Sequence, residues 1–112
     1  MAGEIQITMP VLKVLREMVD DPLREHYGLE LMKATGLKSG TLYPVLARLQ
    51  RADWIEGTWE IQADELGRPA RKFYKLTTAG MEMARHALAE AYASIAPTSA
   101  THRKPRLAGG GL

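Results

Sequence analysis

Residues 38–49 are Lys38-Ser39-Gly40-Thr41-Leu42-Tyr43-Pro44-Val45-Leu46-Ala47-Arg48-Leu49, and this stretch decides the fold. Its apolar side chains recur at the spacing of one face of a helix, namely Leu42, Val45, Leu46 and Leu49. The first turn carries small hydrogen-bonding side chains and a tyrosine, and no Asp or Glu occurs between Leu31 and Ala52. The stretch therefore predicts a helix that buries one side and is suited to press the other against nucleic acid.

The start of this helix depends on a proline. With Ser39 as the N-cap, Pro44 lies just past the positions where a helix tolerates proline. It removes the bond to the Gly40 carbonyl and crowds that carbonyl, at a cost of roughly 3 kcal/mol in a helix interior. We therefore expect a slightly irregular first turn. In the alternative interpretation the helix begins near Leu42, and Pro44 is then ordinary.

Two further helices are predicted before it. The first starts at Thr8, has Pro10 in its first turn and ends at residues 20–22. Its apolar stripe is wider than one small core needs, so we expect it to face more than its own domain. The second runs from about residue 26 to residue 35, and Gly36 ends it. Helix, short glycine turn and helix form the helix-turn-helix pattern.

The next segments alternate between apolar and polar side chains, which is the pattern of half-buried strands. The alternation covers residues 55–62 and again 71–76, with a turn region rich in glycine and proline at 63–70. We expect a β-hairpin wing with a mobile basic tip, because the loop is too long for a two-residue turn. Trp54 and Trp59 are expected to fill the base of the wing, and a ligand pocket lined by them is the alternative.

A last helix is predicted from Thr77 or Thr78 to about Ala96. Its apolar residues fall at alternating spacings of three and four, as in a coiled-coil seam of about two heptads, and they are Met81, Ala84, Leu88, Ala91 and Ile95. Such a stripe can pack on the parent domain. Because no later element covers it, burial against a second copy is the preferred interpretation.

The order of the predicted elements is that of a winged helix-turn-helix, mainly α with a small antiparallel β-hairpin. We divide the chain into a DNA-binding domain at residues 1–76, a C-terminal dimerisation helix at 77–96 and a flexible basic tail at 97–112. The tail is more typical of a solvated terminus than of a DNA contact.

Composition excludes several classes of protein. The 112 residues suffice for one ordinary domain, and the absence of cysteine excludes disulfides and thiolate metal sites. The three histidines match no metal-ligand spacing, and no catalytic set or phosphate loop stands out, so we expect no enzyme, metal or cofactor. No apolar run approaches the ~20 residues that span a bilayer, and no signal peptide is visible. We therefore expect a cytoplasmic location and no membrane partner.

The net charge of +2 is small, but the charges are unevenly distributed. Residues 31–52 and residues 66–81 contain Lys and Arg without any Asp or Glu. Either window alone is equally well explained as a solvated surface. Two such windows, each on an element suited to nucleic acid, favour DNA binding.

Three stretches together resemble the PadR family of bacterial transcriptional regulators. They are His26-Tyr27-Gly28-Leu29-Glu30-Leu31, then Ser39-Gly40-Thr41-Leu42-Tyr43-Pro44-Val45-Leu46-Ala47-Arg48-Leu49, then Gly67-Arg68-Pro69-Ala70-Arg71-Lys72-Phe73-Tyr74-Lys75-Leu76-Thr77-Thr78-Ala79-Gly80. The resemblance covers roughly residues 11–95. G-T-L-Y-P followed by K-x-Y-x-L-T-x-x-G is a more specific combination than either piece alone.

The resemblance implies a homodimer held mainly by the last helix with help from the first. It also implies repression of a nearby promoter, which a small molecule relieves in many members. The dimer interface predicted in this way comprises Val11, Leu15, Met81, Ala84, Leu88, Ala91, Tyr92 and Ile95. The chain departs from the family in the short loop between its second and third helices and in its short last helix. That helix carries no tryptophan, which argues against an aromatic drug-stacking pocket at the dimer centre.

In a helix-turn-helix, the N-terminal end of the third helix meets base edges in the major groove of double-stranded DNA. Ser39 and Thr41 suit base contacts, Gly40 allows close approach of the backbone, and Tyr43 suits a phosphate or sugar. The remaining predicted contacts are Lys33, Lys38, Arg48, Arg68, Arg71 and Lys72.

Other interpretations stay open for parts of this set. Tyr43 is alternatively a ring that closes the turn, and Arg48 is alternatively solvated or in an internal ion pair. For the whole chain, the alternative function is a winged-helix module that docks on proteins.

Overall fold

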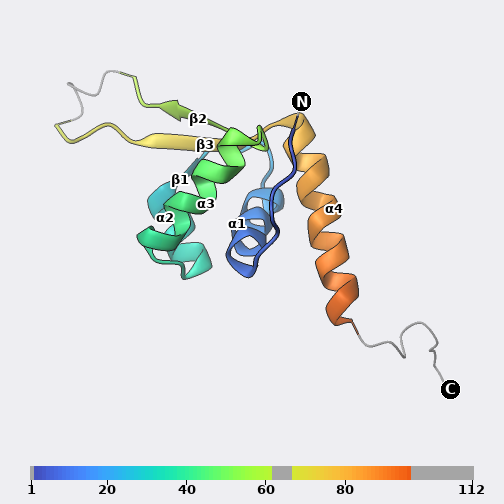
Figure 1. Cartoon of the computed structure of the whole chain (residues 1–112). Coiled ribbons are helices and arrows are strands. Elements are labelled where there is room, and N and C mark those ends of the chain that lie inside the picture. Colours follow the sequence, from blue (N-terminus) through green and yellow to red (C-terminus); the bar gives the residue numbers. More distant parts are fainter. Residues whose placement is uncertain (1, 62–66, 97–112) are drawn as a thin grey trace, which may run out of the picture.

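The computed structural model describes residues 2–61 and 67–96. Within them the chain forms four helices and three short strands (Figure 1), in the order α1 (Met9–Asp20), β1 (His26–Tyr27), α2 (Gly28–Thr35), α3 (Ser39–Arg51), β2 (Ile55–Trp59), β3 (Lys72–Leu76) and α4 (Thr78–Ile95). This is the winged helix-turn-helix that the sequence predicts, with one strand more than expected. The predicted wing tip at residues 62–66 and the predicted basic tail at 97–112 lie outside the described residues.

None of the helices in the described part of the chain is both long and apolar enough to cross a membrane.

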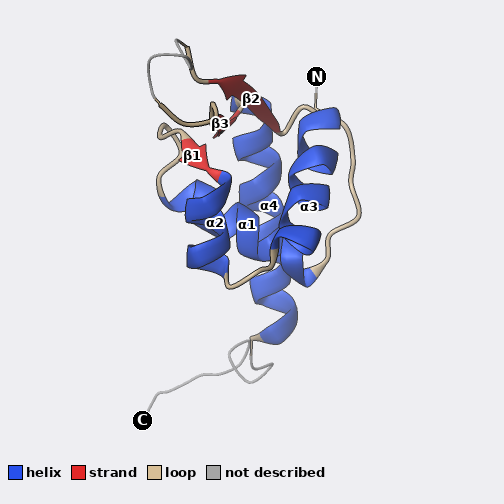
Figure 2. Cartoon of the chain, turned by 90° about the vertical axis from the view of Figure 1, so that its left-hand side faces the viewer, coloured by secondary structure: helices blue, strands red, loops and turns tan. Residues whose placement is uncertain are grey.

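The core lies where α1, α2 and α3 meet beneath the sheet (Figure 2). As predicted, α1 begins after Thr8, whose hydroxyl accepts from the Val11 N–H at 3.4 Å. The predicted stripe of α3 is fully buried, which fixes which side of α3 faces outward. The side chains with less than 2% exposure besides Ile55 and Trp54 come from the three helices: Val11, Val14, Leu15, Met18, Leu31, Leu42, Val45, Leu46 and Leu49.

The second helix begins later than predicted, at Gly28 and not near His26. His26 and Tyr27 instead form β1, which pairs with β3 in the register His26↔Tyr74 and Tyr27↔Phe73. The Tyr27 N–H donates to the Glu30 carboxylate at 3.0 Å, which closes the start of α2. The local sequence pattern favours a helix at these two residues. Their backbone groups pair with β3 instead, which is distant in sequence.

The third helix begins at Ser39, so the prediction that Ser39 is the N-cap was wrong by one residue, and the alternative start near Leu42 was wrong as well. Lys38 holds the N-cap position with extended backbone, and its carbonyl accepts from both Thr41 and Leu42. Pro44 is therefore inside the helix, at its sixth residue. The expected irregularity around the Gly40 carbonyl stays a prediction.

The strands form one antiparallel sheet in the order β1-β3-β2. Strands β2 and β3 pair from Ile55↔Leu76 to Trp59↔Lys72 and project from the helices as the wing (Figure 1). Trp54 is buried at the base of the wing as predicted, but Trp59 is 61% exposed, which corrects the expectation that both fill that base. At residue 59 the hairpin already projects beyond the helices, so the Trp59 side chain has no core to pack against (Figure 1).

The last helix is locked to the start of β2. The Thr77 hydroxyl caps α4 by accepting from the Gly80 N–H at 2.8 Å, and it donates to the Asp53 carbonyl at 2.7 Å. A Cβ atom at Gly80 would overlap the Trp54 carbonyl. The T-x-x-G sequence is therefore the joint that directs α4 along α1, against which Ala84 and Ala87 are buried.

Candidate DNA-binding surface

The first turn of α3 is exposed at an edge of the molecule. Lys38, Ser39, Gly40 and Thr41 are all exposed, because the buried stripe anchors the opposite side of the helix in the core. In Figure 1 the turn between α2 and α3 and the wing project to the same side. This arrangement lets a helix enter a major groove while a wing reaches the neighbouring backbone.

Tyr43 lies across the start of α2. A Cβ atom added at Gly28 would come within 2.9 Å of two Tyr43 ring carbons, so the missing side chain at Gly28 makes room for the ring. Tyr43 is nevertheless 44% exposed. The ring thus closes the helix-turn-helix and still presents an edge to solvent, which combines the two interpretations of this residue.

Two lysines flank the first turn of α3. Lys33 lies in the last turn of α2, and Lys38 is the N-cap of α3. Both are exposed, and neither forms an ion pair within the described residues. Their ammonium groups are therefore available to a phosphate.

The far edge of α3 is covered in part by the N-terminal segment. The Gly3 N–H donates to the Ala52 carbonyl at 2.8 Å, and the Trp54 indole donates to the Gly3 carbonyl at 2.5 Å. Arg48 is half-buried beside this segment, and its Nε is buried without a hydrogen-bond partner among the described residues. Arg48 is consequently less accessible to DNA than the exposed Arg51 one turn further on.

Glu60 organises the wing. Its carboxylate accepts the two Nη groups of Arg68 at 2.8 and 3.2 Å and the Arg71 N–H at 2.8 Å. The hydrogen bond from Arg68 lowers the pKa of the Glu60 carboxyl, and the same bond raises the pKa of Arg68. Both groups therefore stay charged at neutral pH. The charge of Arg68 is offset within the wing, which makes it a weaker phosphate ligand than the sequence alone predicts.

Arg71 and Lys72 lie among aromatic rings. The guanidinium carbon of Arg71 is 5.0 Å from the centre of the Tyr27 ring. The Lys72 ammonium is 5.7 Å from the Trp59 ring centre, 5.6 Å from that of Tyr74, and 3.2 Å from Oε1 of Gln50. Neither cation has a carboxylate partner within the described residues. Cation–π contacts orient these groups without cancelling their charge.

A cleft of about 490 Å³ opens between the start of α2, α3 and the wing, and the rings of Tyr27, Tyr43, Trp59 and Tyr74 contribute to its walls together with Arg71 and Lys72. Burial raises the pKa of the Tyr74 phenol, and the nearby Tyr43 phenol raises it further, so the Tyr74 hydroxyl stays protonated at neutral pH. No acid is among the residues that line the cleft. The charged residues in its lining are the cations Arg71 and Lys72.

Comparison with known protein families identifies the family of this chain. The model of the transcriptional regulator PadR-like family matches residues 14–86. The chain belongs to the PadR-like family. The sequence resemblance is thereby confirmed, and the family is one of transcriptional regulators.

Solved structures agree with this assignment. A PadR-like transcriptional regulator from Bacillus cereus is 28% identical with a TM-score of 0.59, covering 82% of this chain and 88% of that chain. MepR, a transcription regulator of the Staphylococcus aureus multidrug efflux pump MepA, is 19% identical with a TM-score of 0.64, covering 88% and 67%. MarR from Escherichia coli is 20% identical with a TM-score of 0.60, covering 87% and 73%. The last two show the fold alone. A search of curated protein sequences finds no significant match.

The predicted dimer residues of this PadR-like chain divide into two groups. Val11, Leu15 and Ala84 have no exposed surface within the protomer, which removes them from the predicted interface. Helices α1 and α4 contact each other within the protomer, so part of the apolar stripe of α4 is already covered by the protein's own domain. Tyr92 and Ile95 are 72% and 79% exposed, while Met81, Leu88 and Ala91 are half-buried. The free apolar part of α4 is therefore its C-terminal half with Met81.

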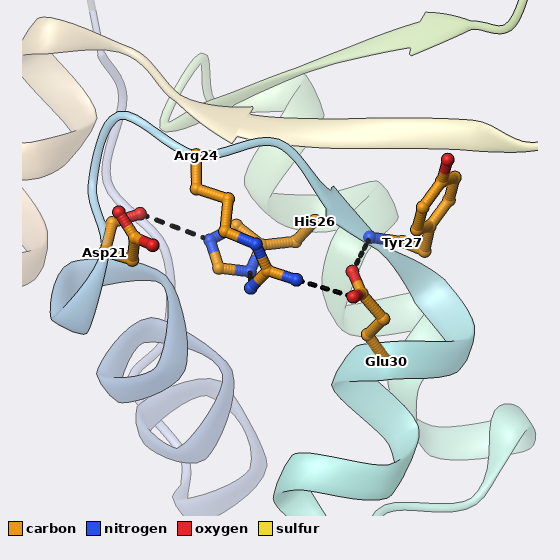
Figure 3. A network of polar contacts seen from close by, with 5 residues as sticks. All are labelled: Asp21, Arg24, His26, Tyr27 and Glu30. Atoms are coloured by element: carbon orange, nitrogen blue, oxygen red, sulfur yellow. Dashed lines mark hydrogen bonds and ion pairs between the residues drawn. The ribbon is translucent and has the colours of Figure 1, made fainter.

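A polar network that sequence reasoning missed sets the start of α2 (Figure 3). The buried His26 ring lies 3.4 Å from the Asp21 carbonyl and 3.4 Å from Nη1 of Arg24, and Arg24 pairs with Glu30 at 2.5 Å. Glu30 also accepts the Tyr27 N–H. The spacing of three between Tyr27 and Glu30 is the available sequence signal, because an acid at that offset suits a helix start. Glu60 gave no such signal, since its partners lie across the hairpin.

Proposed function

We propose that this PadR-like protein binds DNA sequence-specifically as a homodimer and represses transcription. The observation that carries the proposal is the exposed, acid-free first turn of α3, held outward by a fully buried stripe. A helix-turn-helix reads base edges with this end of its recognition helix. Ser39 and Thr41 then contact bases, and Gly40 allows the backbone to come close.

Affinity is proposed to come from four cations in each protomer. Lys33 and Lys38 bind phosphates beside the first turn of α3, and Arg71 and Lys72 bind the backbone from the wing. Tyr43 packs against a sugar or phosphate between these two groups. Arg48 and Arg68 contribute less, because one is half-buried and the other is paired with Glu60.

The finer parts of the function rest on the family and on α4. We propose that α4, at residues 77–96 of our division, joins two copies through its exposed apolar residues, and that a small molecule relieves repression. The two recognition helices of such a dimer read an inverted repeat with half-sites about one helical turn, ~34 Å, apart. A bacterial regulator of this kind acts in the cytoplasm, where the DNA is.

The deciding experiment is a gel shift with the DNA upstream of the protein's own gene, with a shuffled duplex as control. We expect binding at low salt and a specific preference for the upstream DNA. If four cations in each protomer bind phosphates, ~8 are neutralised in the dimer, and log K falls with log salt at a slope of roughly −7. Absence of binding at low salt would leave the protein-docking module as the better function, which the exposed Trp59 and Ile61 of the wing would then serve.

Two matched substitutions separate base contact from phosphate contact. Thr41→Ala is expected to reduce the preference for the upstream DNA over the shuffled duplex, because it removes a base contact. Lys38→Ala is expected to weaken both duplexes alike and to reduce the salt slope by about 1 for each protomer. If Thr41→Ala leaves the preference unchanged, the first turn of α3 is not the sequence-reading element.

A further inference from the structure

We propose that Gln50, in the last turn of α3, is a positioning residue for DNA binding. Its side-chain carbonyl accepts from the Lys72 ammonium of the wing at 3.2 Å and holds that cation in place for a phosphate. This hold is a property of the protomer alone. Its effect on DNA rests on the proposed DNA-binding function.

The Lys72 side chain reaches α3 by running over a glycine of the neighbouring strand. Lys72 pairs with Trp59 and Tyr74 pairs with Gly57, so the four side-chain positions share one face of the sheet. A Cβ atom at Gly57 would lie 2.5 Å from Lys72 Cε and 3.2 Å from Gln50 Oε1. The missing side chain at Gly57 therefore leaves the path by which Lys72 reaches the helix.

Two aromatic rings complete the surroundings of the ammonium. Its nitrogen lies 5.7 Å from the ring centre of Trp59 and 5.6 Å from that of Tyr74. An ammonium has three N–H donors, and the amide of Gln50 takes one of them. Because Lys72 is only half-buried, the ammonium is held in one place and can still donate to a phosphate.

The neutral charge of the acceptor distinguishes this contact from the other ordered cation of the wing. The guanidinium of Arg68 is bound by the Glu60 carboxylate, which offsets its charge. The amide of Gln50 instead orients Lys72 and leaves the positive charge in place. A long side chain that is ordered before binding loses less conformational freedom on the DNA. Over the two protomers of the proposed dimer, this favours DNA binding by about tenfold.

The first test is NMR spectroscopy of the full chain without DNA. Because protons beside the face of an aromatic ring resonate upfield, we expect the Cε protons of Lys72 upfield of those of the other lysines. Gln50→Leu should move them toward the ordinary position, whereas Gln50→Glu keeps an acceptor and should leave them upfield. An ordinary Lys72 signal in the wild type, or one that Gln50→Leu does not move, refutes the hold.

The second test displaces Lys72 without changing Gln50. The methyl group of Gly57→Ala meets the end of a flexible side chain, and alanine is less unfavourable than glycine inside a strand. We therefore expect urea unfolding to show wild-type or higher stability, while the Lys72 signal moves to the ordinary position. Thr58→Ala is the matched control, because Thr58 is exposed and the next residue of β2 points to the opposite face. An unmoved Lys72 signal in Gly57→Ala refutes the path over the glycine.

Gel shifts over a range of salt concentrations then separate orientation from charge. Gln50→Leu should weaken DNA binding about tenfold with the wild-type slope in log salt, because Lys72 keeps its charge but loses its fixed place. Gln50→Glu should make the slope shallower by roughly 1.8 for the dimer, because a carboxylate now offsets Lys72 in each protomer. Wild-type affinity of Gln50→Leu, or equal slopes for the two variants, overturns the positioning role.

The two proposals fail in different ways. If the Lys72 signal behaves as expected and the wild type does not bind DNA, the hold stands and the DNA-binding function fails. If the wild type binds DNA and Gln50→Leu binds it equally well, the DNA-binding function stands and Gln50 is not a positioning residue.

Discussion

The glycines of this chain differ in the neighbours that an added Cβ atom would contact. A Cβ atom at Gly40 would meet nothing within 4 Å, whereas one at Gly28 would press on the Tyr43 ring and one at Gly80 would overlap a backbone carbonyl. The protomer therefore explains why Gly28 and Gly80 lack side chains. It does not explain Gly40, which lies in the exposed first turn of α3. The function of that glycine has to be sought in what approaches from outside.

We predict that Gly40→Ala makes the protein more stable and a weaker DNA binder. Alanine in a helix is favoured over glycine by roughly 0.5–1 kcal/mol, and no neighbour in the protomer opposes it. If DNA approaches the backbone closely at this point, an added methyl group in that contact costs roughly 1–3 kcal/mol, which is roughly 5- to 150-fold in affinity. Urea unfolding and gel shifts on the same preparation measure the two effects. Unchanged DNA affinity would show that the backbone of α3 does not approach DNA closely there.

Glu60 provides the second prediction at the residue scale. Glu60→Gln removes the carboxylate that offsets Arg68, while its amide oxygen still accepts from the Arg71 N–H. One more cation in each protomer then becomes available to phosphate, so we expect tighter DNA binding at low salt and a slope in log salt steeper by roughly 1.8 for the dimer. Glu56→Gln is the matched control, because Glu56 is an exposed acid on β2, the strand that leads to Glu60, and it has no ion pair among the described residues.

An equal gain in both variants would mean that net charge, and not release of Arg68, is responsible. The effect should also be independent of pH near neutrality. A carboxyl whose pKa is lower in the folded than in the unfolded protein stabilises the fold fully above its unfolded pKa. This stabilisation is lost as the pH falls through the folded pKa. Since the pKa of Glu60 is lowered from an ordinary value of 4.5, its pairing with Arg68 persists throughout the neutral range.

At the scale of elements, the sequence predicted what depends on local periodicity and missed what depends on distant partners. The stripe of α3, the Thr8 cap, the cap at Thr77 or Thr78 and the two strands of the hairpin follow from spacing within single segments. Strand β1 does not, because a segment of two residues has no period, and only its pairing with β3 makes it a strand. Similarly, the alternation predicted Trp59 as half-buried, although the pattern carries no information on where the hairpin leaves the core.

The joint between β2 and α4 carries the prediction at this scale. Gly80→Ala should destabilise the protein by about 1–3 kcal/mol, because its methyl group overlaps the Trp54 carbonyl and either the helix or the strand must shift. The higher helix propensity of alanine, worth about 1 kcal/mol, opposes the loss but does not outweigh it. Gly40→Ala is the matched control, since the same substitution near the start of another helix meets open space. A stability of Gly80→Ala equal to wild type would show that α4 is not fixed by this contact.

At the scale of the whole molecule, α4 has two apolar surfaces, one buried in the protomer and one exposed. Gly80, Ala84 and Ala87 are buried within the protomer, where small side chains let α4 approach its own domain. Tyr92 and Ile95 are left exposed near the end of the helix. The sequence gives one continuous seam for both, because the two surfaces overlap around a helix. Burial in the protomer is what separates them and leaves the C-terminal half as the proposed dimer surface.

We predict that Tyr92→Glu combined with Ile95→Glu converts the protein to a folded monomer. Both side chains are largely exposed in the protomer, so their replacement should leave its circular dichroism and core unchanged. Two buried charges in each half of a small apolar interface are not compensated by partners, and the dimer should dissociate. Light scattering coupled to size exclusion measures the mass. The monomer should bind one half-site weakly and show a salt slope of roughly half the dimer value, near −3.5.

Ala93→Glu is the control for this experiment, because Ala93 is exposed and two residues before Ile95, which places it on the opposite side of α4. It should remain a dimer with full DNA affinity. If the double variant also stays dimeric, the copies meet elsewhere, and the exposed end of α4 has another partner. If wild type is itself a monomer that binds the inverted repeat with the full slope, dimerisation is not the source of its affinity, and the proposed assembly is wrong.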